Sequence, residues 1–245
     1  MDFEVAESIF DNANKYSNVE LKGIHVHIGS QITDPAPFVE AVKRVIDFVE
    51  KSEISIEWLN LGGGFGIVYN KKEKATTAED FAKEIIPIIK GKPFKLILEP
   101  GRFVSGNSGI LVSRITYIKT GSTGKKFAIC DAGMNDLLRP SLYKAYHEIL
   151  PVAQRAVKKE KYDIVGPICE SGDYLALDRE MPELISGEYI AVMSAGAYGF
   201  TMSSNYNTRP RPAELLVMDN EVKVIRQAET FKDLINGEKI LKELK

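Results

Sequence analysis

Three short segments of the sequence combine glycine with side chains that could hold an anion and a polar ring. They are HVHIGS (25–30), GGGFG (62–66) and EPGR (99–102). The first begins within an apolar run, and the other two directly follow one. Successive glycines let backbone N–H groups approach an anion closely, and an arginine fork holds phosphate or carboxylate. A carboxylate beside a pyridine nitrogen raises the pKa of that nitrogen and keeps it protonated. Together these groups could bind a phosphorylated aromatic ligand.

Each segment also has a simpler interpretation. GGGFG could be a flexible turn, and a dinucleotide-binding GxGxxG would need glycine where the chain has Ile67. His25 and His27 share one side of an expected strand and could bind a metal. The only other histidine in the sequence offers no third ligand at suitable spacing, so no metal site is expected. Considered by itself, HVHIGS is more simply explained by a histidine with a structural role. In EPGR the carboxylate and the guanidinium could simply pair with each other.

The second half of the sequence has polar motifs between expected strands. They are RPSLY (139–143), CESGD (169–173), AGAYG (195–199) and SSNYNTRPRPAE (203–214). Polar loops on a rigid scaffold suggest a binding site without specifying its chemistry. Considered by itself, the cysteine of CESGD could be an inert, buried thiol, which is the usual state of cysteine.

The elements that must position the first three segments alternate between helix and strand. Hydrophobic periodicity predicts helices over 4–17, 37–51 and 78–90 and strands over 21–28, 56–61 and 95–98. This order is typical of βα units that form a parallel sheet. Because ligands bind at the carboxyl ends of parallel strands, we expect the three segments to form one composite site.

After Arg102 the pattern changes to short strands separated by glycine, asparagine and aspartate. These strands are expected over 108–121, 125–133, 188–196, 213–220 and 221–227, with a final helix over 229–245. The sequence therefore predicts an α/β unit over 1–103 and a β-rich unit over 104–245. Three βα units cannot close a barrel, which needs about eight strands, so the sheet is open or belongs to a larger assembly.

The composition excludes several classes of function. Lys+Arg number 32 and Asp+Glu 34, giving a net charge of −2 that offers no attraction for nucleic acid or an anionic membrane. No apolar run approaches the roughly 20 residues that cross a bilayer, and the first residues do not resemble a targeting peptide. Two cysteines are too few for a disulfide framework, so a cytoplasmic location is expected.

Taken together, the motifs resemble those of diaminopimelate decarboxylases, which depend on pyridoxal 5′-phosphate (PLP). The matching segments, in order, are GIHVHIGSQI, LGGGFG, EPGR, CDAGMNDLLRPSLY, GPICESGD, AGAYGF and MSSNYNTRPRPAE, and they span about residues 19–227. Related ornithine and arginine decarboxylases share the barrel elements, but GPICESGD and RPSLY resemble the diaminopimelate branch. The resemblance implies α/β plus β: the last three βα units of a TIM-type barrel, followed by a C-terminal β domain.

The resemblance also implies roles for individual residues around the cofactor. His27 would stack on the PLP ring, and Glu99 would face its pyridine nitrogen. The residues expected around the PLP phosphate are Ser30, Gly63, Gly64, Gly101 and Arg102.

The substrate, meso-diaminopimelate, would lie between groups of opposite charge. Arg102, Arg139 and Tyr143 would hold its carboxylate, and Glu170 its far amino group. Tyr198 would contact both cofactor and substrate. Cys169 would protonate the substrate carbon after carbon dioxide leaves, giving L-lysine. In the family, cysteine and glutamate reach the site from a partner subunit, so a homodimer is expected.

The family's PLP-binding lysine is missing from the sequence. It lies in a segment reading roughly Y-A-x-K-A-N, which the chain lacks, and GIHVHIGS corresponds to the sixth of eight barrel strands. We therefore expect negligible activity from the isolated chain, which would need a chain supplying the missing barrel half. The sequence fits a truncated gene product, half of a split enzyme or a decayed paralogue. Alternatives are a decarboxylase of another basic amino acid and a non-catalytic PLP-binding subunit.

Overall fold

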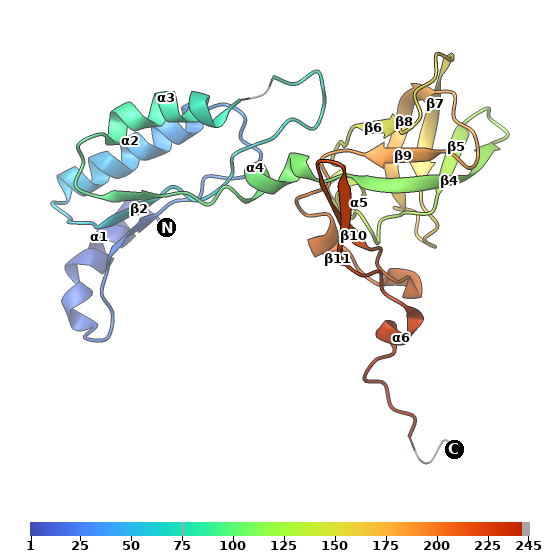
Figure 1. Ribbon diagram of the computed structural model, residues 1–245. Coiled ribbons are helices and arrows are strands. Elements are labelled where there is room, and N and C mark those ends of the chain that lie inside the picture. Colours follow the sequence, from blue (N-terminus) through green and yellow to red (C-terminus); the bar gives the residue numbers. More distant parts are fainter. Residues whose placement is uncertain (75, 242–245) are drawn as a thin grey trace. The chain divides into compact units, whose positions relative to one another are not determined.

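The computed structural model describes residues 1–74 and 76–241, which form two compact units (Figure 1). The first unit is Met1–Gly106 and the second is Asn107–Lys245. The division therefore falls three residues after the boundary expected at 103. Each unit has its own cluster of buried apolar side chains.

The first unit is a parallel three-stranded sheet with helices in the connections. Its strands are β1 (Gly23–His25), β2 (Trp58–Asn60) and β3 (Lys95–Ile97), in the order β1-β2-β3. Its helices are α1 (Phe3–Asp11), α2 (Ala36–Lys51), α3 (Ala78–Ile89) and α4 (Gly101–Ser105). The βα order predicted from the sequence is confirmed, although each strand is shorter than expected and α1 ends at Asp11 instead of residue 17.

Helices α2 and α3 lie on the same side of the sheet (Figure 1). Helix α3 begins with a capping box, in which Thr77 and Asp80 satisfy each other's backbone N–H groups. The middle residue of β2, Leu59, is fully buried against the two helices. On the opposite face, His25 and the neighbouring strand-end residue Ile97 are exposed. Among the described residues of this unit, helices thus cover the face of the sheet that carries Leu59.

Aromatic stacking holds the turn after β2 against this core. The Phe65 ring stacks on Phe38 with a centroid distance of 4.5 Å and meets the edge of Phe81 at 5.0 Å. Phe103, in α4, packs on the same ring at 6.2 Å. Phe65 belongs to GGGFG, so burial of its ring fixes the glycines that precede it.

The second unit is built on a mixed six-stranded sheet in the order β6-β9-β4-β5-β7-β8. Only the β5–β7 pair is parallel. Its strands are β4 (Leu111–Thr120), β5 (Lys126–Cys130), β6 (Ile149–Pro151), β7 (Lys159–Val165), β8 (Tyr174–Pro182) and β9 (Tyr189–Val192), and helix α5 (Arg139–Tyr143) lies between β5 and β6. This confirms the predicted β-rich unit, but RPSLY forms a short helix where a loop was expected.

Strands β7 and β8 were missed from the sequence because charged residues interrupt their apolar pattern. Asp163 of β7 is 5% exposed, a burial that its contacts explain. Its carboxylate accepts from the Lys125 ammonium at 2.7 Å and from the Asp178 backbone N–H at 2.8 Å. In the sequence, an aspartate at such a position suggests a loop, because its burial and its partners are not visible there.

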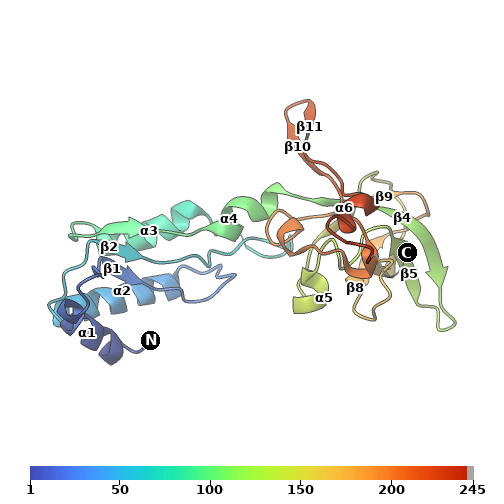
Figure 2. The same cartoon turned by 90° about the horizontal axis from the view of Figure 1, so that it is seen from below.

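The chain continues into a hairpin of β10 (Glu214–Met218) and β11 (Glu221–Arg226), which extends away from the six-stranded sheet (Figure 2). Both strands expose apolar side chains, including Val217 (68%) and Val222 (63%). The helix predicted over 229–245 is wrong for the described residues. Only α6 (Phe231–Leu234) forms, because the left-handed Gly237 (φ +95°) turns the chain; residues 242–245 lie outside the described part.

Within the described residues, every helix is too short or too polar to span a bilayer.

The Phe65 cluster generates a stability prediction. Replacing Phe65 with Ala should destabilise the first unit by about 3–5 kcal/mol, because it removes a buried ring shared by three aromatic partners. Trp58 is the single tryptophan and lies in β2, so its fluorescence during urea denaturation reports on this unit. The control Phe231→Ala, at a ring 67% exposed, should shift the free energy of unfolding by less than about 0.5 kcal/mol. Equal effects of the two changes would contradict the cluster's role.

Candidate functional site

The three strand-end segments of the first unit meet at one edge of its sheet. Backbone hydrogen bonds continue past the strands: the Val26 N–H donates to the Asn60 carbonyl at 2.9 Å and the Leu61 N–H to the Ile97 carbonyl at 3.0 Å. One step further, the Glu99 N–H donates to the Gly62 carbonyl at 2.8 Å. The parallel ladder therefore brings HVHIGS, GGGFG and EPGR together.

The glycines at this edge are required by how closely the segments approach. Gly64 has φ +102°, and a Cβ there would lie 2.3 Å from the Gly29 carbonyl oxygen. A Cβ on Gly63 would lie 2.4 Å from the Glu99 carbonyl oxygen. At Gly101, by contrast, a Cβ would meet no atom within 4 Å. The backbone is therefore tightly packed at Gly63 and Gly64, whereas the space next to Gly101 is open.

His27 and Glu99 take fixed partners in these segments. The Gly63 N–H donates to Nδ1 of His27 at 3.3 Å, which places the ring hydrogen on Nε2 in the neutral tautomer. Asn60 Nδ2 donates to Glu99 Oε1 at 2.8 Å, while Asn60 Oδ1 accepts from the Gly62 N–H at 2.8 Å. Asn60 thus joins the carboxylate to the glycine turn. Asn60 was not predicted from the sequence as a site residue, although its place at a strand end before three glycines was a usable signal.

Arg102 connects the third segment to the first. Its Nη2 donates to the Ser30 hydroxyl at 3.0 Å and its Nη1 to the Tyr69 hydroxyl at 2.7 Å. The guanidinium also lies over the Tyr69 ring, 5.7 Å from the centroid. Ser30, accepting from Arg102, still carries its own proton for donation. The Arg102 guanidinium therefore brings a positive charge, and the Ser30 hydroxyl a further donor, to this edge of the sheet.

In the second unit, Arg139 is buried at the start of α5. Its Nη1 lies 2.8 Å from Nε2 of His147, a fully buried ring whose Nδ1 lies 2.8 Å from the Met193 carbonyl oxygen. A carbonyl only accepts and a guanidinium only donates, so His147 is neutral with its hydrogen on Nδ1. From the sequence, His147 was considered only as a metal ligand, and this contact was not predicted.

The CESGD segment forms the turn between β7 and β8. Cys169 is exposed, whereas the other cysteine, Cys130, is buried, and burial raises the pKa of its thiol to about 12. The inert buried thiol is therefore Cys130. The Cys169 N–H donates to Asn207 Oδ1 at 2.8 Å, and the Tyr206 hydroxyl donates to Glu170 Oε2 at 3.3 Å.

The buried carboxylate of Asp173 holds this turn through hydrogen bonds from backbone N–H groups. Asp173 accepts from the Ile168 N–H at 2.6 Å and the Met134 N–H at 2.7 Å, and burial raises its pKa. The Ser141 hydroxyl donates to the Gly172 carbonyl at 2.6 Å, which ties α5 to the same turn. The helix that begins with Arg139 is therefore hydrogen-bonded to the turn that contains Cys169.

Two tyrosines of the expected site are accessible in the second unit. Tyr143, at the end of α5, is 62% exposed. Tyr198 is 42% exposed and has the left-handed φ of +59°, a strained conformation that marks many functional positions. The expected cofactor residues from His27 to Arg102 thus lie in the first unit, and the remaining site residues in the second.

The described residues contain no group of three or more His, Cys, Asp or Glu side chains arranged to hold a metal ion.

The Arg139–His147 contact makes a testable prediction. His147→Leu should lower the free energy of unfolding by about 2–5 kcal/mol, because it leaves a buried guanidinium N–H and a carbonyl without this partner. His147→Gln, whose amide can both donate and accept, should cost less than half as much. Thermal unfolding followed by circular dichroism compares the variants. Nitrogen NMR of His147 should show a protonated Nδ1, and a ring protonated at Nε2 would contradict the assignment.

Comparison with known proteins adds family relationships to this geometry. A diaminopimelate decarboxylase of Aquifex aeolicus is 49% identical over 234 residues, which are 94% of this chain and 56% of that protein. A second, from Pseudomonas aeruginosa, is 43% identical and is matched over 57% of its length. The chain thus spans little more than half the length of these relatives.

Solved structures agree with these relationships. A crystal structure of an A. aeolicus protein superposes with a TM-score of 0.93 at 48% identity, covering 96% of this chain and 59% of that one. Diaminopimelate decarboxylase from M. jannaschii, solved with L-lysine, superposes with a TM-score of 0.91 at 38% identity, over 98% of this chain and 57% of that one. The family model described as the C-terminal sheet domain of pyridoxal-dependent decarboxylases matches residues 9–196. The chain therefore belongs to the family of pyridoxal-dependent decarboxylases.

Proposed function

We propose that this chain is the C-terminal part of a diaminopimelate decarboxylase, which converts meso-diaminopimelate to L-lysine and carbon dioxide with PLP. The observation that carries the proposal is the meeting of Ser30, the Gly63–Gly64 backbone, Glu99 and Arg102 at one sheet edge. Relatives at 42–49% identity that bear this enzyme's name support the choice of substrate.

The residues of the first unit fit PLP. Arg102, Ser30 and the backbone of Gly63, Gly64 and Gly101 would surround the phosphate, next to the open space at Gly101. His27 would lie against the ring. Glu99, oriented by Asn60, would hold a proton on the pyridine nitrogen. When bound, PLP withdraws electrons from the substrate carbon and so permits loss of its carboxylate.

The residues of the second unit would bind the substrate and supply a proton. Arg102, Arg139 and Tyr143 would hold the substrate's carboxylate, and Glu170 its far amino group. Tyr198 would contact both cofactor and substrate. A substrate charged at both ends requires such separated cations and anions for selectivity. The exposed Cys169 thiol would donate its proton to the carbon that has lost carbon dioxide.

The active assembly would contain more than this chain. We infer that the three βα units are the last units of a TIM-type barrel, because β1–β3 are parallel and helices cover the face of the sheet that carries Leu59. The remaining barrel strands, from a further chain or segment, would supply the PLP-binding lysine. In a homodimer, the exposed Cys169 and Glu170 would serve the partner's site.

Complementation tests the proposal directly. Purified chain mixed with PLP and meso-diaminopimelate should release negligible lysine, because no lysine of the Y-A-x-K-A-N type is present. We expect the remainder of the A. aeolicus relative to carry that segment, so adding it should restore lysine release. Cys169→Ala in the restored enzyme should lower kcat by about 10²–10⁴-fold.

Two results would contradict the proposal. One is steady lysine release by the chain alone, which would show that the missing lysine is not required. The other is a correctly assembled complex that binds PLP yet does not decarboxylate meso-diaminopimelate.

A further inference from the structure

We propose that Asn207 and Tyr206 are positioning residues that hold Cys169 and Glu170 in their working orientations. The proposal rests on the proposed function, because it gives those two residues the roles of proton donor and substrate ligand. It assigns a purpose to the SSNYNTRPRPAE motif, whose loop spans residues 203–214.

Two adjacent residues of this loop contact two adjacent residues of the CESGD turn. Asn207 Oδ1 accepts from the Cys169 N–H at 2.8 Å, across 38 positions of sequence. The Tyr206 hydroxyl donates to Glu170 Oε2 at 3.3 Å, and the Gly172 N–H donates to Glu170 Oε1 at 3.4 Å. Both oxygens of the Glu170 carboxylate are thereby oriented, and the backbone that carries the Cys169 thiol is restrained.

The backbone of Asn207 explains why asparagine occupies this position. Asn207 has φ 58° and ψ 29°, and Thr208 follows with φ 57°. Asparagine adopts this left-handed conformation more readily than most residues. It therefore satisfies two requirements at once: the turn of the loop and an acceptor aimed at Cys169. Glycine could meet only the first requirement.

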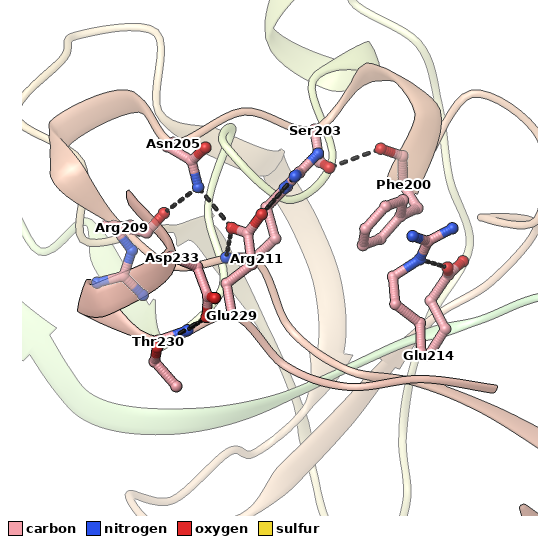
Figure 3. A network of polar contacts seen from close by, with 10 residues as sticks. Phe200, Ser203, Asn205, Arg209, Arg211, Glu214, Glu229, Thr230 and Asp233 are labelled. Atoms are coloured by element: carbon pink, nitrogen blue, oxygen red, sulfur yellow. Dashed lines mark hydrogen bonds and ion pairs between the residues drawn. The ribbon is translucent and has the colours of Figure 1, made fainter. Parts of the chain in front are cut away.

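A polar network keeps the loop itself in place (Figure 3). Glu229 accepts from Asn205 Nδ2 at 2.6 Å and from the backbone N–H and Nε of Arg211, both at 2.8 Å. The bonds from Arg211, and to a smaller extent that from Asn205, lower the pKa of Glu229 to about 2, so the carboxylate stays ionised at neutral pH. The Arg209 guanidinium donates to the Asp131 carbonyl at 2.6 Å, which joins the loop to the CDAGMND segment.

Tyr206 remains a donor over a wide pH range. The negative charge of Glu170, together with their hydrogen bond and partial desolvation, raises the pKa of the Tyr206 hydroxyl. The phenol therefore keeps its proton at neutral and mildly alkaline pH and goes on donating to the carboxylate. Glu170 is thus presented in one orientation to a cationic group.

Amide hydrogen exchange on the full chain tests the restraint without any catalytic activity. Asn207→Gly keeps the left-handed backbone but removes the acceptor, so exchange at the Cys169 amide should accelerate by about tenfold or more. Asn207→Asp keeps the acceptor and should stay within about threefold of the parent. Tyr206→Phe should leave the Cys169 amide unchanged. Exchange in β4 and β9 is the control for global destabilisation and should be the same in all variants.

The restored enzyme provides a second readout that a merely structural role would not produce. Asn207→Gly should lower kcat with little change in KM, because Cys169 acts in proton transfer, and Asn207→Asp should recover most of it. Tyr206→Phe should mainly raise KM, because Glu170 binds substrate.

The outcomes separate this proposal from the proposed function. Equal exchange at the Cys169 amide in the glycine and aspartate variants would overturn the positioning role, whatever the enzyme does. A restored parent enzyme without decarboxylase activity would overturn the proposed function. The exchange result would then still decide whether Asn207 restrains the turn.

Discussion

The backbone ladder of three parallel strands is the constraint on which the first unit depends. In-register pairing sets Ile24 beside Leu59 and Leu59 beside Leu96, so the strands end at the same edge. Backbone hydrogen bonds then carry the alignment into the segments that follow the strands. Only glycine fits where these segments cross, because a Cβ on Gly63 or Gly64 would collide with a carbonyl oxygen. The polar residues at the edge are therefore placed by backbone geometry before any ligand binds.

In the second unit, carboxylates turned toward backbone N–H groups hold the loops that carry the site residues. Asp173 supports the Cys169 turn from beneath, and Glu229 closes the loop that contains Asn207. A carboxylate that accepts several N–H bonds restrains a loop without needing an apolar core. This explains how Cys169 can be both exposed and restrained.

Periodicity in the sequence predicted the βα units, and with them the meeting of HVHIGS, GGGFG and EPGR, because each strand led directly into its polar segment. It failed where a buried polar group replaced an apolar one, as at Asp163 in β7. The expected helix over 229–245 was also wrong within the described residues, since α6 ends at Leu234 and the chain turns at the left-handed Gly237. His147 and Asn207 were missed for another reason. Asn207 bonds Cys169, 38 positions away, and His147 bonds the Met193 carbonyl, 46 positions away, as well as Arg139, 8 positions away. None of these pairs follows a helix or strand period, so they leave no local pattern.

We propose above all that the sheet edge of the first unit binds the phosphate of PLP through Arg102 and Ser30. The most direct measurement is an equilibrium titration of PLP, and of pyridoxal lacking the phosphate, against the chain assembled with the remainder of the A. aeolicus relative. Arg102→Ala should weaken PLP binding by about 10–100-fold, the value of a lost charged hydrogen-bond partner, and leave pyridoxal binding unchanged. Equal affinity of the parent and Arg102→Ala for PLP would contradict the account.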